Sequence, residues 1–339
     1  MNKIIRFGII GSGGIATLWL KGARQVEDVK VVAIHSLDLT SAKELAKTFD
    51  IPSVEESYEA MLQREDIDAI YVGTPHTFHY ENALKALNHG KHVLCEKPMG
   101  INQAQAVEMF DTAKRNNCFL MEAMWMRFFP AMQQLRDVIA SGAIGRVRNI
   151  RATFAYNIGG LPKTHRLLNP ALAGGALLDV GVYCLHFCNA LLREHASQMT
   201  GFASINSTEE AYGVDEQCNI IAEYPDSVLA FLCCAVLNDM GEDATIYGEK
   251  GRIVLPVFWK PTTYTIINEE GSKTVTVDVP QLDNDLADVG YQYEIKHVAD
   301  CIRKGKLESP EMTHETTLKI LEQSDELRAS WKLVYPDEK

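Results

Sequence analysis

The sequence predicts an α/β domain built on a parallel sheet, followed by an α+β domain with a large, mostly antiparallel open sheet. The chain has 339 residues, which exceeds the size at which one hydrophobic core usually stops growing, so two domains are expected. In the first third, short apolar runs alternate with amphipathic helical segments, which indicates βαβ units. Further along, apolar residues recur at every second position, which is typical of antiparallel strands. We therefore predict domains at 1–124 and 125–339.

Five buried strands are expected in the first domain, with helices between them. The first helical segment carries Ile15, Leu18 and Ala23 on one side. The expected strands are 4–11, 29–36, 67–75, 91–98 and 118–125, and the further helices are 41–49, 81–90 and 102–116. Because helices of this length connect the successive strands, we expect one parallel sheet with right-handed crossover connections.

The second domain begins with a helix and then becomes rich in strands. The expected helices are 130–142, 173–192, 293–305 and 314–331, of which the second follows a Gly-rich segment. The alternating runs are 147–157, 199–206, 217–225, 228–237, 242–255 and 264–279. Short turn signals such as YPDS and GEKG separate these runs, which favours hairpin connections.

A glycine-rich loop joins the first strand to the first helix. Gly11-Ser12-Gly13-Gly14-Ile15-Ala16 matches the GxGxxA pattern of dinucleotide-binding loops, and its strand–loop–helix context is the one that this function requires. Gly11 permits a tight turn, and Gly13 lets the backbone approach a pyrophosphate at the helix N-terminus. The alternative is a Gly-rich turn without a ligand. We predict a Rossmann domain that binds NAD or NADP.

The end of the second strand determines which nicotinamide cofactor is preferred. An acidic residue there would bind the ribose 2′-hydroxyl of NAD, and an arginine nearby would favour NADP. Ser36 occupies the acidic position and is followed by Leu37, so neither signal is present. His35 is a pH-dependent candidate for contact with a phosphate. We predict dual use of NAD and NADP.

Composition limits the classes of partner. The formal charge is -12 without a Lys/Arg cluster, which argues against nucleic acid and anionic membranes. We see no apolar run near the roughly 20 residues that a membrane helix needs. The eight cysteines are scattered and form no CxxC pair, so we expect buried free thiols, no metal site and a cytoplasmic protein.

Lys97 is the first candidate for catalysis. It lies in Cys95-Glu96-Lys97-Pro98, at the carboxyl end of the fourth strand, where ligands bind in open α/β sheets. Oxidation of an alcohol needs a group that takes the hydroxyl proton while hydride leaves to the cofactor. A lysine of lowered pKa suits that role or can polarise the oxygen. The alternative is a surface lysine in a turn.

Several motifs together resemble the glucose–fructose oxidoreductase/inositol dehydrogenase (Gfo/Idh/MocA) family over essentially the whole chain. They are TPHTFH at 74–79, GKHVLCEKP at 90–98, and three longer stretches at 121–131, 174–187 and 293–310. Within the family, the longer stretches are most similar to the dimeric dihydrodiol dehydrogenases, a subgroup also linked to NADP-dependent D-xylose oxidation. The resemblance implies a nicotinamide-dependent oxidoreductase and a homodimer formed through the open face of the second sheet.

The resemblance also implies roles for further residues. Asp179 and Tyr183 are four apart in an expected helix, so they share one side. Many family members have histidine where this chain has Tyr183. A tyrosine with a pKa of about 10 needs a neighbouring cation to act as a base, and Lys97 could supply it. We predict a Lys97–Tyr183 couple, with Asp179 orienting the substrate or the lysine. For Tyr183, core packing is the alternative.

The remaining site residues follow from the same resemblance. Residues expected near the cofactor are Gly11, Gly13, Gly14, Ile15, Ser36, Leu37, Tyr71, Thr74, Pro75, His79, Glu96 and Lys97. Residues expected around the substrate are Trp125, Arg127, Phe154 and Tyr183. Helix capping or surface exposure is the alternative for His79, and core packing is the alternative for Trp125 and Phe154.

We therefore predict an NAD(P)-dependent dehydrogenase or reductase for a secondary alcohol of a small cyclic diol, sugar or polyol. Within enzymes, the alternative is an inositol or other sugar dehydrogenase or reductase. From another class, the alternative is a non-catalytic NAD(P)-binding regulator. Loss of the lysine or of the Asp/Tyr pair would have favoured the regulator, but Lys97, Asp179 and Tyr183 are present.

Overall fold

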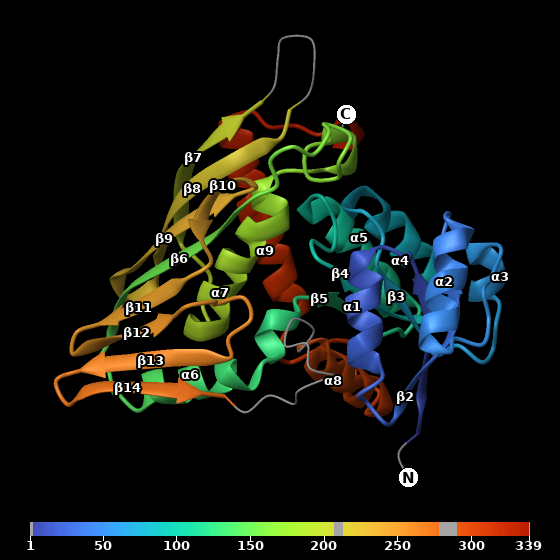
Figure 1. Cartoon of the computed structure of the whole chain (residues 1–339), viewed down its shortest axis with the longest axis horizontal. Helices are drawn as coiled ribbons and strands as arrows, with labels where there is room; N and C mark the ends of the chain where they lie inside the picture. The colour runs from blue at the N-terminus through green and yellow to red at the C-terminus, as the bar shows by residue number, and fades with distance from the viewer. Residues whose placement is uncertain (1–2, 207–212, 278–289, 339) are drawn as a thin grey trace. The chain divides into compact units, whose positions relative to one another are not determined.

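A computed structural model describes residues 3–206, 213–277 and 290–338 and divides the chain into two compact units (Figure 1). The first unit comprises the described residues of Met1–Phe128 and Pro280–Leu318, and the second comprises those of Phe129–Val279 and Lys319–Lys339. A segment near the C-terminus therefore returns to the first unit.

The first unit is built on a five-stranded parallel sheet with the order β2-β1-β3-β4-β5. The strands are β1 (Ile5–Ile10), β2 (Val29–His35), β3 (Ala69–Val72), β4 (His92–Glu96) and β5 (Leu120–Ala123). All five predicted strands are confirmed. After β2 the chain crosses to the other side of β1 to form β3, so the loops after β1 and β3 meet at the point where such sheets bind ligands.

Helices connect these strands as predicted, and one further helix comes from the C-terminal part of the chain. They are α1 (Gly14–Ala23), α2 (Leu39–Phe49), α4 (His79–Asn88), α5 (Gln103–Arg115) and α8 (Tyr291–Arg303). Three short elements were not predicted: α3 (Tyr58–Leu62), η1 (His76–Phe78) and η2 (Trp125–Phe128). Helix α8 packs closely on α1 because Gly22 has no side chain, and a Cβ atom there would lie 2.7 Å from Tyr291.

The second unit is built on a nine-stranded sheet in which only the pair β6–β9 is parallel among the described pairings. Its path is β14-β13-β12-β11-β6-β9-β8-β7, and β10 pairs with β6. The strands are β6 (Val147–Asn157), β7 (Gln198–Ile205), β8 (Asp215–Tyr224), β9 (Val228–Ala235), β10 (Leu237–Gly241), β11 (Ala244–Gly248), β12 (Gly251–Leu255), β13 (Thr263–Asn268) and β14 (Gly271–Thr276). The predicted fold class is confirmed, although residues 278–279 of the last predicted run lie outside the described residues.

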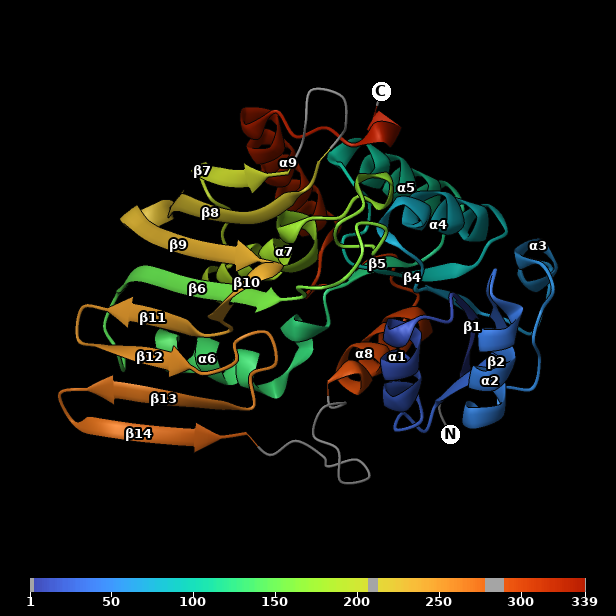
Figure 2. The same ribbon diagram turned by 45° about the horizontal axis from the view of Figure 1, so that its top comes forward.

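Three helices lie on one face of this sheet (Figure 2). They are α6 (Pro130–Ala140), α7 (Val182–Leu192) and α9 (His314–Trp331). The sequence predicted no apolar run of this length, but the described part of the chain holds one stretch, Pro170–Leu192, that is long and apolar enough to cross a membrane. Most of this stretch, which ends with α7, is buried inside the structure. All eight cysteines are free and all but Cys233 are buried, as predicted.

The uncovered face of the sheet carries apolar side chains on its last three strands. Phe202, Ile221, Leu229 and Phe231 are all exposed, and Ile221 lies directly opposite Phe231 in the pairing of β8 with β9.

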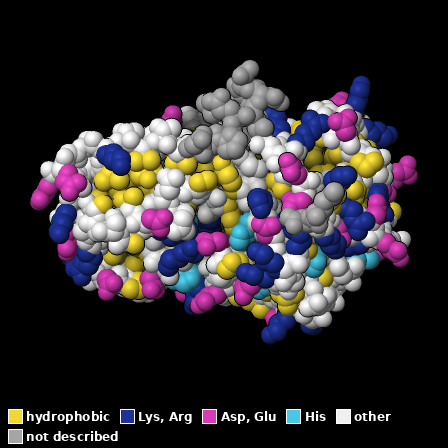
Figure 3. All heavy atoms as spheres, turned by 90° about the horizontal axis from the view of Figure 1, so that it is seen from below, with side chains coloured by type: hydrophobic (Ala, Val, Ile, Leu, Met, Phe, Trp, Pro, Cys, Tyr) yellow, Lys and Arg dark blue, Asp and Glu magenta, His cyan; other side chains and the backbone are white. Residues whose placement is uncertain are grey.

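On the side of the molecule drawn in Figure 3, basic and acidic side chains are intermingled and do not gather into a field of one sign.

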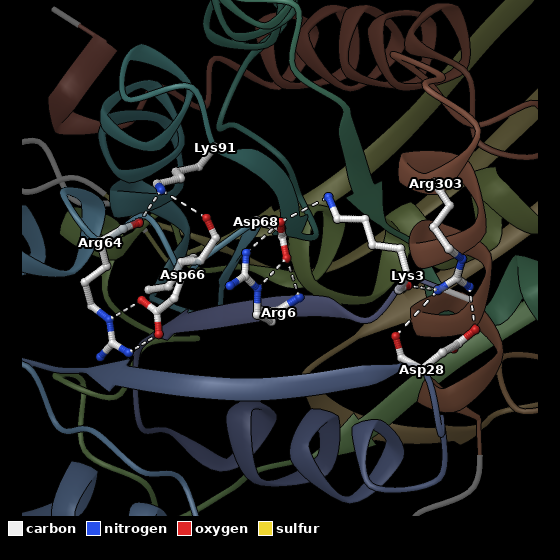
Figure 4. Close-up of polar contacts among 9 residues, drawn as sticks. Lys3, Arg6, Asp28, Arg64, Asp66, Asp68, Lys91 and Arg303 are labelled. Atoms are coloured by element: carbon white, nitrogen blue, oxygen red, sulfur yellow. Dashed lines mark hydrogen bonds and ion pairs between the residues drawn. The ribbon is translucent and has the colours of Figure 1, made fainter. Parts of the chain in front are cut away.

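Ion pairs tie together the amino-terminal ends of the parallel strands (Figure 4). Asp68, just before β3, accepts hydrogen bonds from Arg6 of β1 at 3.0 and 3.2 Å and pairs with Lys3 at 3.3 Å. Arg303, at the end of α8, pairs with Asp28, just before β2, at 2.8 Å. This edge of the sheet is opposite the one that binds ligands, so the network serves stability.

Candidate active site

The loop after β1 has the geometry of a pyrophosphate cradle. Gly11 adopts a positive φ of 106°, and a Cβ atom there would overlap the carbonyl oxygen of Gly73 after β3. In contrast, Cβ atoms added at Gly13 or Gly14 would meet nothing within 4 Å. Helix α1 starts here, with Ile15 in its first turn and no acidic side chain. The open space and the exposed helix N-terminus therefore fit a dinucleotide phosphate.

The end of β2 presents a hydroxyl pair beside this loop. Ser12 Oγ donates to Ser36 Oγ at 2.8 Å, and Leu37 is 94% exposed. The side chain of Asp38 accepts hydrogen bonds from the backbone of α2 and caps that helix. The Asp38 carboxylate therefore already accepts hydrogen bonds, and contact of Ser36 with a ribose stays a prediction.

His79 joins the loops that follow β3 and β4. It is 1% exposed, and its Nδ1 and Nε2 lie 2.7 Å from the carbonyl oxygens of Pro98 and Thr74 respectively. The predicted cofactor residues Thr74 and Pro75 are held in this way next to the turn that follows Lys97. Burial lowers the pKa of His79.

Glu96 is the last residue of β4, Lys97 follows it, and the Lys97–Pro98 peptide is cis. The Tyr71 hydroxyl donates to Glu96 Oε1 at 2.7 Å, and the Lys97 amide donates to Oε2 at 3.2 Å. Burial raises the pKa of the Glu96 carboxyl to about 7, against the opposing effects of Tyr71 and Lys97. Tyr71 itself is fully buried and stacks on Trp19 at 4.4 Å, so it lies beneath the site and supports Glu96.

Two of the predicted substrate residues, Trp125 and Arg127, lie in the first unit and are buried in η2. Trp125 stacks on Tyr291 of α8 at 4.4 Å, and both residues are nearly inaccessible. Arg127 Nε donates to the carbonyl oxygen of Glu311 at 2.9 Å. These contacts fix η2 against segments from near the C-terminus. Their role toward a substrate stays a prediction.

The other predicted residues meet in the second unit. Asp179 lies in a π-helical turn, η4 (Leu177–Gly181), and Tyr183 lies one turn further on in α7. Phe154 of β6 contacts the Tyr183 ring edge to face at 5.3 Å. The sequence predicted an uninterrupted helix here, and the π turn is a correction to that expectation.

Three residues that the sequence analysis missed complete this group. Tyr156 donates to Asp179 Oδ2 at 2.7 Å, and Arg166 donates to Oδ1 at 2.9 Å. Trp259 stacks on Phe154 at 5.2 Å. Tyr156 could have been found, because it lies two residues after Phe154 and so shares its face of the strand. Arg166 and Trp259 lie in irregular segments without a local signal.

The predicted residues thus form two groups, one in each unit. The first holds the glycine loop, Ser36, Thr74, His79 and Lys97, and the second holds Asp179, Tyr183 and Phe154. The Lys97–Tyr183 couple joins residues of different units and stays a prediction.

Comparison with known proteins identifies the family. Residues 5–124 match a family model described as "Oxidoreductase family, NAD-binding Rossmann fold", and residues 132–254 match the "GFO/IDH/MocA C-terminal domain". The chain belongs to the Gfo/Idh/MocA oxidoreductase family. It is therefore an NAD(P)-dependent oxidoreductase acting on CH–OH groups, which agrees with the cradle around Gly13.

Members of this family with known activities resemble the chain over nearly its full length. A trans-1,2-dihydrobenzene-1,2-diol dehydrogenase from Bos taurus is 34% identical, with 99% of each chain covered. A 3-ketoreductase from Actinomadura kijaniata, solved with TDP-benzene and NADP, is 26% identical with a TM-score of 0.80, covering 96% of this chain and 97% of that one. An aldose-aldose oxidoreductase from Caulobacter crescentus, complexed with glycerol, has a TM-score of 0.85 at 24% identity, covering 97% and 98%, and shows the shared fold.

Proposed function

We propose that the chain transfers hydride between NAD or NADP and a secondary alcohol or carbonyl of a small cyclic diol, sugar or polyol. The observation that carries this proposal is the aromatic group of Phe154, Tyr183 and Trp259 beside the ion pair of Asp179 with Arg166. Aromatic faces suit a diol ring or the apolar face of a sugar, and the charged pair suits hydroxyl groups. The dihydrodiol dehydrogenase relatives support this substrate class.

Lys97 and Tyr183 are the proposed acid–base groups, and Asp179 is proposed to orient the substrate or Lys97. The nicotinamide supplies or accepts the hydride when it is bound. In the oxidative direction, the substrate hydroxyl gives its proton to Tyr183, and Lys97 polarises that oxygen through its ammonium group. Glu96 accepts the Lys97 amide at 3.2 Å, and its ionised form is attracted by the Lys97 charge.

The proposed arrangement of the protein follows the same family. Residues 1–124 form the proposed cofactor domain, and residues 125–339 form the proposed domain for substrate binding and dimerisation, although the described residues of Pro280–Leu318 belong to the first compact unit. The uncovered apolar face of β7, β8 and β9 supports a homodimer. A cytoplasmic location fits the eight free cysteines.

Lys97→Met tests the catalytic assignment. The substitution keeps the length of the side chain but removes its charge and hydrogen-bond donors, so we expect kcat/KM to fall by about 10²-fold or more. Turnover is followed by NAD(P)H absorbance with diols, aldoses and inositols as substrates, and cofactor binding is measured by fluorescence titration. Near-normal turnover of Lys97→Met with any accepted substrate would contradict the assignment, whereas a parent protein that binds cofactor without turning over any of these substrates would favour a regulator.

A further inference from the structure

Arg166 has a defined place in the second unit that no established role explains. Its segment, between β6 and η4, brings the guanidinium to Asp179, where Nη1 donates to Oδ1 at 2.9 Å. The Asp179 side chain is 5% exposed, and the Arg166 side chain is 46% exposed. A buried carboxylate thus receives a partly exposed cation on one oxygen and the Tyr156 hydroxyl on the other.

The same guanidinium acts electrostatically on Tyr183. Burial lowers the pKa of Arg166, but the charge of Asp179 and the hydrogen bond to it outweigh burial, with smaller contributions from Tyr156 and Tyr183, so the pKa is raised overall. Arg166 therefore stays protonated beside two phenols. The Tyr156 hydroxyl donates a hydrogen bond to Asp179. Burial, followed by the charge of Asp179, raises the pKa of Tyr156.

Tyr183 is the phenol proposed above for proton transfer. A phenol with a pKa of about 10 acts as a base near neutral pH only when a positive charge stabilises its ionised form. Without a cation, the charge of Asp179, one helical turn away, opposes ionisation of Tyr183. Arg166 neutralises that charge and attracts the phenolate.

We propose that Arg166 is a positioning residue for the reaction: it holds Asp179 and supplies, from within the second unit, positive charge that stabilises the Tyr183 phenolate. This inference rests on the proposed function of Tyr183. Within this unit, the described contacts of Asp179 bring Arg166 of the preceding segment and Tyr156 of β6 to the turn before Tyr183, and Glu242 before β11 acts on Tyr156. The charge of Asp179 opposes ionisation of the Tyr183 phenol, and the charge of Arg166 favours it.

The experiment measures the phenol titration of Tyr183 in the cofactor-free protein by NMR of ¹³C-labelled tyrosine, with the signal assigned from Tyr183→Phe. In Arg166→Met, we expect the titration midpoint to rise by about one pH unit or more, because the guanidinium that counters the effect of Asp179 on the phenol is then removed. In Arg166→Lys, we expect a smaller rise. In Asp179→Asn, we expect the midpoint to fall, because Arg166 is then unopposed. Arg146→Met is the matched control, since Arg146 also pairs with a carboxylate, Glu249, at 3.5 Å and is 54% exposed.

Opposite shifts in Arg166→Met and Asp179→Asn support the proposal, since a purely structural role for Arg166 does not predict them. An unchanged or lowered midpoint in folded Arg166→Met overturns it, as does a rise in Lys97→Met without one in Arg166→Met. If Arg166→Met does not fold, Asp179→Asn decides, and a midpoint that does not fall overturns the proposal. The pH profile of kcat/KM should follow the midpoint. Normal turnover of Tyr183→Phe would instead refute the proposed function, while the titration still tests the role of Arg166.

Discussion

The two residues that follow β2, Ser36 and Leu37, are the predicted determinants of cofactor preference. The Ser36 hydroxyl is neutral and bonded to Ser12, and the Leu37 side chain is 94% exposed. A 2′-phosphate therefore meets neither a carboxylate nor a guanidinium from these two positions. We predict that the parent uses NAD and NADP with a preference below about tenfold, or about 1.4 kcal/mol.

Single charges at these positions should shift the preference in opposite directions. Ser36→Asp should favour NAD by repelling the 2′-phosphate, and Leu37→Arg should favour NADP by binding it. The measurement is kcat/KM for both cofactors in the parent and both variants, with Leu37→Gln as the uncharged control. A thousandfold preference in the parent would show that another residue determines the choice.

Sequence patterns predicted those site residues whose roles depend on neighbours along the chain. Gly11 and Lys97 could be proposed from the sequence because both follow the ends of predicted strands. Arg166 was not found because its contact with Asp179 depends on the path of an irregular segment, and charged residues in such segments are usually solvated.

At the level of elements, strongly periodic segments were predicted and short ones were not. Strand β6 and helix α9 have the predicted bounds, whereas α3 and β10 have five residues each and are too short to show a period. The π turn η4 escaped prediction because it depends on a distant residue: Asp215 Oδ2 accepts the amide of Leu177 at 2.6 Å.

Helix α8 buries the carboxyl group of Glu294 in the first unit, and the effect of this burial on the free energy of unfolding depends on pH. Glu294 is fully buried, and neither of its carboxyl oxygens has a hydrogen-bond partner among the described residues. Burial, followed by repulsion from Glu96, raises the pKa of Glu294 well above 4.5. The folded state then holds a proton that the unfolded state releases, so stability falls as pH rises from about 4.5 toward the raised pKa.

Glu294→Gln should remove this part of the pH dependence. We expect the free energy of unfolding of the variant to be close to that of the parent at pH 5 and higher than that of the parent at pH 8. Urea unfolding at both pH values measures it, with Glu326→Gln, on the exposed side of α9, as the matched substitution. A parent that is equally stable at the two pH values would show that Glu294 gains a partner in solution.

In the first unit as a whole, the two ends of the parallel strands have different tasks. Ion pairs such as Arg6–Asp68 and Arg303–Asp28 lie at the amino-terminal ends (Figure 4), whereas Gly11, Thr74 and Lys97 follow the carboxyl ends. Substitutions in the ion-pair network are therefore expected to change stability and leave hydride transfer intact, as in other open α/β sheets.

The uncovered face of the second unit leads to a prediction about the whole molecule. Phe202, Ile221, Leu229 and Phe231 share this face by the register of β7, β8 and β9, and their exposure leaves apolar area in water. Burial of such a face against a second copy gains free energy in proportion to the apolar area removed from water.

Because Phe231 pairs with Arg151 of β6, Phe231→Lys sets two cations side by side on the face and adds a charge that an interface core disfavours. We expect the dissociation constant of the proposed homodimer to rise at least about tenfold, or about 1.4 kcal/mol, as measured by sedimentation velocity over a range of concentrations. Val107→Lys, at an exposed apolar position on α5, is the control and should leave the dimer unchanged. A parent protein that sediments as a monomer at every concentration, or an equal effect of both lysines, would contradict dimerisation through this face.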